Sequence, residues 1–396
     1  MDLADLYSDL HRHPELAFDE VRTAAIAAEH LRTGVYEVTE GIGRTGVVGV
    51  LRNGEGPTIL LRADMDALPV HEDTGLDYAS VNEGIMHACG HDVHVACLIG
   101  AADTLSRTRQ EWAGTVIALF QPAEEAGAGA RELLDDGLYE RIPVPDVVLG
   151  QHVGPAPAGV LGAHAGSAFA SADSLDITIT GRGGHGSRPE TTIDPVIIAA
   201  AIVMRLQTIV AREIAPHHTA VLTVGRLVAG TKNNIIPETA VLGVSVRAYS
   251  DEVRSNLLAA IERIARAEAQ ASGAQDPTFH YAESFAVTVN DVHATEATMR
   301  AFRSAFGDAA VLDPGPVSGS EDVGLLATAA GVPLVYWILG GADPAAYQAA
   351  VVAGTVDRDI PSNHSPQFAP VISPTLDRGV EALVVAARHW LATRTA

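Results

Sequence analysis

The sequence has few cysteines, few basic residues and no long apolar run. Its 396 residues include only Cys89 and Cys97, which excludes a disulfide framework. Lys and Arg total 26 against 49 Asp and Glu, and the net charge of -23 disfavours nucleic acid and anionic membranes as partners. The longest apolar stretches are too short or too interrupted to span a bilayer, and the first residues do not resemble a signal peptide. We therefore expect a cytoplasmic protein that acts on a small molecule, with no nucleic-acid or membrane partner.

The first part of the chain alternates short apolar runs with helical patterns. Hydrophobic residues make up 47%, enough for a sizeable core, and the length predicts two domains. Runs bounded by Gly, Pro and Asn are typical of strands, and longer stretches have helical spacing. The strand-like runs are 46–51, 58–63, 115–120 and 147–150, and the helical stretches are 2–33, 94–105 and 130–136. This alternation predicts an α/β fold with a largely parallel sheet, in which ligands bind at the carboxyl ends of the strands.

The pattern changes after about residue 167. Residues 174–180 alternate strictly, as a half-exposed strand does. Further helices are expected at 195–210 and 251–271, and further strands at 220–225 and 240–247. This order fits a small antiparallel sheet backed by two helices, and α/β character then resumes near residue 295. We predict a discontinuous α/β domain over 1–167 and 285–396, interrupted by a smaller α+β domain over 168–284.

Two polar groups near the strand ends have the chemistry of metal ligands. Cys89 and His91 lie two positions apart, and on a strand-like stretch this spacing puts both side chains on one side. Thiolate and imidazole suit zinc and also accept manganese or cobalt. A buried cysteine near a core histidine would explain the pair equally well.

Adjacent carboxylates, Glu124 and Glu125, follow another apolar run. One of them can bind metal while the other takes a proton from water, and an exposed acidic turn is the alternative explanation. His152 follows the run at 147–150, where it is either a ligand or a satisfied core histidine. His364 lies in a loop near the C-terminus, where many histidines are simply solvated. Together these signals of compatible chemistry predict a metal site.

The motifs, in their order and spacing, resemble the M20 metallopeptidase family. The likeness is to its amidohydrolase branch, which includes hippurate hydrolases, aminoacylases and indoleacetyl-amino-acid hydrolases, with N-acyl-glutamine aminoacylases nearest. It extends over nearly the whole chain. The segments that carry it are 11–15 (HRHPE), 62–69 (RADMDALP), 86–94 (MHACGHDVH), 121–125 (QPAEE), 181–187 (GRGGHGS), 319–322 (GSED) and 364–366 (HSP). The resemblance implies a catalytic α/β domain, an inserted dimerisation or lid domain, and hydrolysis of N-acyl-L-amino acids.

The same resemblance implies roles for the candidate residues. Two divalent ions, zinc or manganese with cobalt or nickel as alternatives, are expected on Cys89, His91, Glu125, His152 and His364. Glu124 matches the general base, and Asp66 matches a carboxylate that orients a ligand. Asp92 is expected beside the ligands and Asp64 is not expected to bind metal. Which ligand bridges the ions stays open, although Cys89 is a fair guess.

Three further candidates lie in the inserted domain. The resemblance makes His185 a residue that reaches into the partner subunit of a homodimer and stabilises the oxyanion of the reaction. Asn234 and Arg247 match positions that hold the substrate α-carboxylate, a task that suits the bidentate fork of arginine. A surface histidine and ordinary loop or strand polarity are the alternatives. Val323 departs from the family, which has an aromatic residue there, and this affects the expected wall of the substrate pocket.

Two other functions fit part of this pattern. A di- or aminopeptidase could use the same two-metal scaffold, but it would need a pocket for a free α-amino group. A non-catalytic metal-binding protein, such as a sensor or scaffold, could use the same ligands. Glu124 beside Glu125 argues against the latter, because a passive site needs no base.

Overall fold

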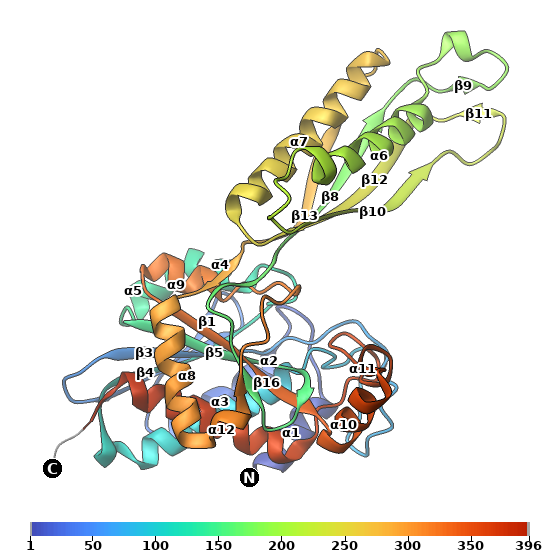
Figure 1. Ribbon diagram of the computed structural model, residues 1–396. Helices are drawn as coiled ribbons and strands as arrows, with labels where there is room; N and C mark the ends of the chain where they lie inside the picture. Colours follow the sequence, from blue (N-terminus) through green and yellow to red (C-terminus); the bar gives the residue numbers. More distant parts are fainter. Residues whose placement is uncertain (1, 394–396) are drawn as a thin grey trace. The chain divides into compact units, whose positions relative to one another are not determined.

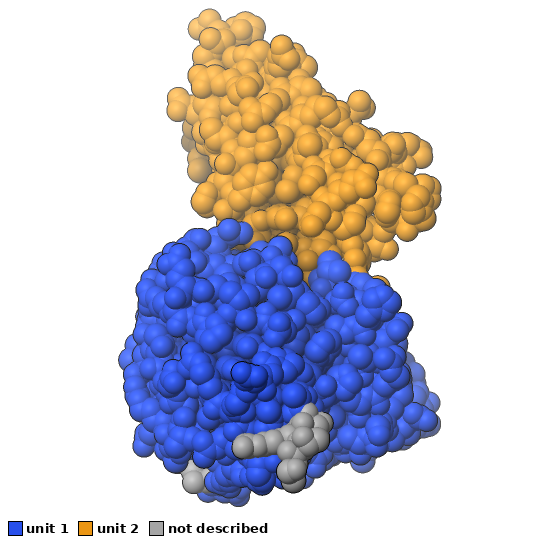
Figure 2. Space-filling model, turned by 90° about the vertical axis from the view of Figure 1, so that its left-hand side faces the viewer, with its two compact units in different colours: residues 1–166, 289–315, 322–396 blue, residues 167–288, 316–321 orange. Residues whose placement is uncertain are grey.

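The computed structural model describes residues 2–393 and divides the chain into two compact units. Unit 1 consists of residues 1–166, 289–315 and 322–396, and unit 2 of residues 167–288 and 316–321 (Figure 2). Unit 2 is therefore inserted into the sequence of unit 1. The chain also returns to unit 2 for a short segment at 316–321, which no pattern in the sequence indicated.

A large mixed sheet forms the centre of unit 1. Its strand order is β1-β2-β4-β3-β5-β16-β6-β15, with β17 paired to β4. The middle strands β4, β3, β5 and β16 are parallel, whereas β1, β2 and β17 pair antiparallel. The strands are β1 (Glu37–Ile42), β2 (Gly46–Asn53), β3 (Thr58–Asp64), β4 (Trp112–Gln121), β5 (Val147–Pro157), β6 (Leu161–Gly162), β15 (Val311–Leu312), β16 (Leu334–Ala342) and β17 (Ala392–Thr393). The predicted α/β class with a largely parallel sheet is confirmed.

Helices cover this sheet, with α3 and α12 beneath it and α4 and α9 above it in Figure 1. The longer helices are α1 (Leu3–Arg12), α2 (Val21–Thr33), α3 (His91–Arg107), α8 (Val292–Phe306) and α12 (Ile372–Trp390). The shorter ones are α4 (Gly129–Asp135), α5 (Leu138–Arg141), α9 (Gly324–Ala330), α10 (Pro344–Ala353), α11 (Val356–Asp359), η1 (Arg109–Glu111) and η3 (Asp308–Ala310). Because α3 is buried on almost every side, its first residues are enclosed by the rest of unit 1.

The start of α3 differs from the prediction. The helix was expected from residue 94, but it begins at His91, directly after Gly90 in a left-handed conformation (φ +81°). A Cβ atom at Gly90 would lie 2.4 Å from Val153 Cγ1, so only glycine fits this turn. The expected strand-like geometry of Cys89 and His91 is therefore wrong: Cys89 lies in a turn and His91 is the first helical residue.

Unit 2 contains a four-stranded antiparallel sheet in the order β10-β12-β8-β13, and α6 and α7 lie side by side over it (Figure 1). Its main elements are β8 (Ser171–Thr180), α6 (Pro195–Arg212), β10 (Ala220–Ala229), β12 (Thr239–Ala248), α7 (Asp251–Ala271) and β13 (Thr278–Phe285). Smaller elements are β9 (Gly184–His185), η2 (Pro189–Thr191) and β11 (Ile235–Ile236). The paired strands β7 (Gly166–Phe169) and β14 (Thr288–Asn290) fall where the chain passes between the units. The predicted antiparallel sheet with two helices is present. Strand β13 was not predicted, because its mostly exposed side chains give little apolar signal.

Helix α6 is the one helix of residues 2–393 that is long and apolar enough to cross a membrane by length and composition. One side of it, which includes Ile202 and Leu206, is packed in the core of unit 2. The other side exposes Ile197 and Met204, with 65% and 72% of their surfaces accessible. We interpret α6 as a core helix whose outer face leaves apolar surface available for an interaction.

Candidate metal centre

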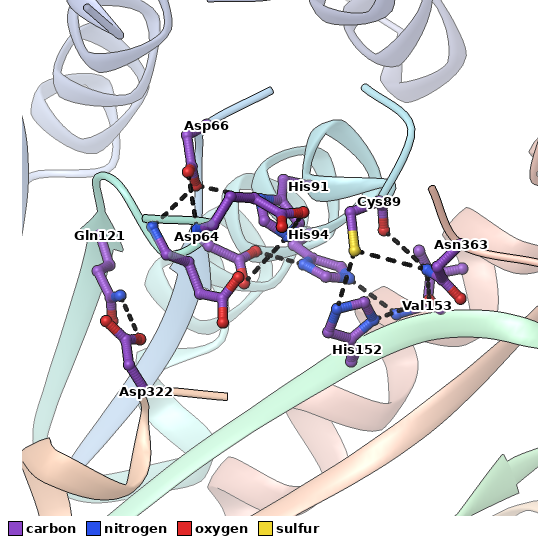
Figure 3. A network of polar contacts seen from close by, with 12 residues as sticks. Asp64, Asp66, Cys89, His91, His94, Gln121, His152, Val153, Asp322 and Asn363 are labelled. Carbon is purple, nitrogen blue, oxygen red and sulfur yellow. Dashed lines mark hydrogen bonds and ion pairs between the residues drawn. The ribbon is translucent and has the colours of Figure 1, made fainter. Parts of the chain in front are cut away.

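The five predicted metal ligands all belong to unit 1, where they converge on one small region. Figure 3 shows three of them, Cys89, His91 and His152. Cys89 lies in the turn before α3, His91 begins that helix, Glu125 follows β4, His152 lies within β5, and His364 lies in the loop after α11. Cys89 Sγ is 3.5 Å from His152 Nε2, and His364 Nε2 is 3.3 Å from Glu125 Oε1. The fold thus brings together side chains that are far apart in the sequence.

Two overlapping groups of these ligand atoms share Cys89. Its Sγ atom lies within 4.8 Å of a ring nitrogen of both His91 and His152. In the second group it lies within 4.8 Å of a Glu125 carboxylate oxygen and a His364 ring nitrogen. A residue common to two groups is placed to contact two ions. His91 and Glu125 also belong to more than one such group, so Cys89 stays a prediction as the bridging ligand.

The His364 loop is fastened to the Cys89 turn. The backbone N–H of His364 donates to the carbonyl of Ala88 at 2.8 Å, and Asn363 Nδ2 donates to the carbonyl of Cys89 at 3.1 Å. His364 itself has a left-handed backbone (φ 69°), which is uncommon for residues other than glycine and is concentrated at functional sites. These bonds hold two distant segments of the candidate site in register.

Asp66 accepts hydrogen bonds from three residues of the candidate site. His91 Nδ1 donates to its Oδ1 atom at 3.2 Å, so a neutral His91 ring presents the lone pair of Nε2. The backbone N–H groups of Glu124 and Glu125 donate to the same carboxylate at 3.1 and 3.0 Å. Asp66 therefore makes the contacts required of a residue that orients a ligand, and it also positions the Glu124–Glu125 pair.

The residues present fit a divalent cation. His91 Nε2 and Glu125 Oε1 are buried 3.8 Å apart, and within residues 2–393 their polar neighbours include other candidate ligands, such as His364 Nε2 at 3.3 Å from Glu125 Oε1. Buried polar atoms without partners are costly, and a cation between them would satisfy both. The set of one thiolate, imidazole nitrogens and a carboxylate suits zinc and accepts manganese, cobalt or nickel.

Protonation separates the candidate ligands into two kinds. Burial lowers the pKa of His152 to about 3, so its ring is neutral and can bind metal directly. Hydrogen bonds with Cys89 and Glu125 raise the pKa of His364 to about 10, and burial raises the pKa of the Cys89 thiol. Asp64 and Asp66 also raise the pKa of His91. Metal binding must therefore displace protons from Cys89, His91 and His364, which makes the affinity increase with pH.

The predicted base, Glu124, lies in a loop with strained backbone. Its side chain is 4% exposed, and a carboxylate oxygen lies within 4.8 Å of ligand atoms of His91 and Glu125. The preceding Ala123 has φ +50°, and its N–H donates to the buried Glu20 carboxylate at 2.8 Å. Sequence reasoning missed Glu20, because an acidic residue just before a helix has no feature that marks it as buried.

A buried polar network that the sequence analysis also missed lies next to the site. Arg62 is buried within β3 and donates to Gln121 Oε1 at 2.9 Å, Asp64 Oδ2 at 2.5 Å and Asp322 Oδ1 at 3.1 Å. Asp322 Oδ2 accepts from the N–H of Ala130 at 2.8 Å. The usable signal was an arginine inside the apolar run 59–63. Asp64 is paired with Arg62, but its carboxylate also lies within 4.8 Å of ring nitrogens of His91 and His94, so its exclusion from the ligands stays a prediction.

Asp92 faces away from the metal ligands and towards α1. Its Oδ2 atom accepts from His11 Nδ1 at 2.6 Å, and His11 Nε2 donates to Glu72 Oε1 at 3.2 Å. Both partners of His11 are carboxylates, so its ring carries both protons. Burial alone would lower the pKa of His11, but Asp92 and Glu72 raise it to about 9. Asp92 thus joins α1 to the start of α3.

The charged His11 predicts that unit 1 loses stability as the pH rises. The pKa of His11 is about 9 in the folded chain and 6.5 in the unfolded chain, so protonated His11 favours the folded state. This stabilisation is fully present below pH 6.5 and is lost as the pH rises through 9. Relative to His11→Gln, the wild-type free energy of unfolding should fall by about 3 kcal/mol over this range. Urea titrations followed by tryptophan fluorescence measure it, because Trp112, Trp337 and Trp390 all lie in unit 1. If the free energies of unfolding of the wild type and His11→Gln differed by the same amount at every pH, His11 would not be the charged group proposed here.

The other three predicted residues belong to unit 2. His185, in β9, pairs with Ile235 of β11, and the N–H of Ser187 donates to His185 Nδ1 at 3.1 Å. A neutral His185 therefore carries its proton on Nε2, as a donor to an oxyanion must. Asn234 is adjacent, since its carbonyl accepts from the N–H of Gly186 at 2.8 Å.

Arg247, in β12, is held by the segment that returns to unit 2. Its Nη1 atom donates to the carbonyl of Ser318 at 2.8 Å and to Ser320 Oγ at 3.0 Å. This leaves Nε and Nη2 for another acceptor. Val323, where an aromatic residue was expected, is fully buried at the start of α9.

Comparison with known proteins gives one consistent family. The sequence profile of peptidase family M20/M25/M40 matches residues 60–359. Hippurate hydrolase of Campylobacter jejuni is 40% identical over 318 residues, 80% of this chain and 82% of that protein. Thermostable carboxypeptidase 1 of Saccharolobus solfataricus is 37% identical over 336 residues, 84% of each protein. The crystal structure of a dinuclear metal-binding M20 peptidase from Bacillus subtilis is similar with a TM-score of 0.77, 31% identity and 97% coverage of both chains.

Proposed function

The chain belongs to peptidase family M20/M25/M40, and on this basis we propose that it hydrolyses N-acyl-L-amino acids to a carboxylic acid and a free amino acid. Membership makes it a metal-binding hydrolase of amide bonds. The observation that carries the proposal is the position of Glu124, a buried carboxylate beside the converging metal ligands. A hippurate hydrolase relative, named for an N-acyl amino acid, supports the substrate class.

The metal ligands, Glu124 and His185 have different roles in the proposed amide hydrolysis. Two divalent ions, zinc or manganese, on Cys89 and the other ligands would polarise the carbonyl and lower the pKa of a water molecule. Glu124 takes a proton from the attacking water and passes it to the leaving nitrogen. His185 donates its Nε2 proton to the oxygen of the tetrahedral intermediate. The free thiol of Cys89 needs a reducing compartment, and we therefore place the enzyme in the cytoplasm.

Recognition of the amino-acid half is assigned to unit 2. Arg247 offers Nε and Nη2 to the α-carboxylate of the substrate, with its orientation fixed by Ser318 and Ser320. Asn234, next to His185, supplies a second polar contact. This assignment requires a free carboxylate on the substrate and does not require a free α-amino group.

We also propose that the enzyme is a homodimer in which His185 acts in the active site of the partner subunit. The apolar outer face of α6 and the edge strand β10 support this, because Met204, Leu227 and Val228 are exposed in the single chain. Exposed apolar surface and a free sheet edge are features of an interaction surface in a stable protein.

A substrate panel tests the proposed reaction. We expect kcat/KM for N-benzoylglycine and N-acetylglutamine to exceed that for the matched dipeptides by roughly a hundredfold, because the site has no assigned partner for an ammonium group. Amidation of the α-carboxylate of N-benzoylglycine should also reduce kcat/KM by roughly a hundredfold, because the contact with Arg247 is lost.

Two outcomes of this panel would replace the proposal. Faster cleavage of dipeptides would indicate a peptidase, the second candidate, which the carboxypeptidase relative favours. Failure of a metal-loaded protein to cleave any compound would indicate a non-catalytic metal-binding protein.

A further inference from the structure

A third histidine, His94, lies between the predicted ligands His91 and His152 (Figure 3). Only 1% of its surface is accessible. Its ring stacks on that of His91 with centroids 5.3 Å apart, and it meets the ring of His152 edge-on at 4.7 Å. A change in the position of His94 would therefore disturb both predicted ligands.

Both ring nitrogens of His94 are occupied. Nε2 lies 2.8 Å from the backbone nitrogen of Val153, and because a peptide N–H can only donate, Nε2 is the acceptor. A neutral ring then carries its proton on Nδ1, which donates to Asp64 Oδ1. No lone pair is left for a metal ion, so His94 is not a ligand, even though a ring nitrogen lies close to ligand atoms of Asp64 and His91.

The bond to Val153 replaces a missing strand partner. Strand β3 pairs with β5 only as far as Arg62 opposite Gly150, whereas β16 continues to pair along the other edge of β5. Val153 lies beyond that point and is fully buried, so its N–H would otherwise have no partner. A buried N–H without a partner is costly, so this position needs a side-chain acceptor.

The backbone at Val153 in turn orients His152. The carbonyl of Val153 accepts from His152 Nδ1 at 2.8 Å and from Asn363 Nδ2 at 3.0 Å. With its Nδ1 proton used in this way, His152 presents the lone pair of Nε2 towards Cys89 Sγ, 3.5 Å away. The geometry of this ligand therefore depends on the placement of one backbone residue.

We propose that His94 is a positioning residue that fixes the backbone at Val153 and thereby aims His152 at the metal centre. The carboxylate of Asp64, itself held by Arg62, keeps the His94 proton on Nδ1 and so keeps Nε2 free to accept from Val153. The proposal rests on the proposed function only in treating His152 as a metal ligand.

Two substitutions separate the two bonds of His94. In His94→Gln the amide oxygen can reach the position of Nε2 and accept from Val153, whereas in His94→Asn the shorter amide can only replace the Nδ1 donor to Asp64. Zinc affinity of the metal-free full chain is measured by competition with a chromophoric chelator. We expect His94→Asn to weaken zinc binding by about 10- to 100-fold and His94→Gln to stay within about threefold of the wild type.

His87 provides the matched control. It is buried in the same stretch, but neither of its ring nitrogens is hydrogen-bonded to any of the residues 2–393. His87→Asn should leave the zinc affinity unchanged if the chain folds, as judged by circular dichroism. Equal zinc affinities for the wild type and a folded His94→Asn variant would overturn the proposal.

The tautomer provides a test that does not depend on the variants folding. In wild-type protein labelled with ¹⁵N-histidine, the His94 signals should show a protonated Nδ1 and an unprotonated Nε2. A proton on Nε2 would overturn the proposal even if neither variant folded. Neither readout uses a substrate, so a chain that binds zinc in the expected order but hydrolyses nothing would contradict the proposed function alone.

Discussion

Replacing Glu124 with glutamine should lower kcat by several powers of ten while the metal ions stay bound. General acid–base catalysis alone contributes about 10²- to 10⁴-fold, and here the same carboxylate both activates the water and protonates the leaving nitrogen. The backbone N–H of Glu124 still donates to Asp66 in the variant, so the loop keeps its position. Hydrolysis of N-benzoylglycine and metal content per chain, measured on the same preparation, give the two quantities needed.

The neighbouring residue supplies the control. Glu125→Gln should lower both the metal content and kcat, because Glu125 is a predicted ligand and its Oε1 atom lies among the other ligand atoms. A Glu124→Gln variant that retained near-wild-type kcat with its metal confirmed would show that Glu124 is not the base.

Mixing two inactive variants should restore activity if His185 acts across a dimer. Glu124→Gln and His185→Ala each remove one group from the reaction, but a mixed dimer contains one site with Glu124 from one protomer and His185 from the other. After the two variants are unfolded and refolded together, random pairing predicts about a quarter of wild-type activity, against almost none for either alone. The measurement is the rate of N-acyl amino acid hydrolysis after refolding of the mixture.

The same experiment has its own control. Glu124→Gln refolded with Glu125→Gln should stay inactive, because both changes affect the same unit and no mixed dimer has an intact site. No gain of activity in the first mixture, with mixed dimers confirmed by native mass spectrometry, would exclude a role for His185 in the partner subunit.

Much of the fold could be predicted because its elements have clear periodicity. The apolar runs of β3 and β4 and the alternation in β8 identified strands, and the observed bounds of α7 are the predicted ones. The elements that were not predicted depend on tertiary contacts. The start of α3 depends on a left-handed glycine packed against Val153, and β13 exposes most of its side chains. Neither feature has a local sequence signal.

The candidate site was partly predictable for a similar reason. Residues that follow parallel strands meet at one edge, so the approach of Glu125 to Asp66 follows from topology. His152 lies inside an extended β5 and not after its end, which the run 147–150 did not indicate. The supporting contacts of Glu20, Arg62 and His94 join segments that are distant in sequence, and a single chain carries no pattern that pairs them.

The central claim is a two-ion hydrolytic site, and the metal content of the active enzyme tests it most directly. Protein purified without chelator should contain two divalent ions per chain, and removal of both by chelation should abolish hydrolysis of N-benzoylglycine until zinc or manganese is restored. Cys89→Ala should lose ions from both positions, because its sulfur is shared by the two ligand groups. Full hydrolysis by a chain proven free of divalent metal would contradict the account.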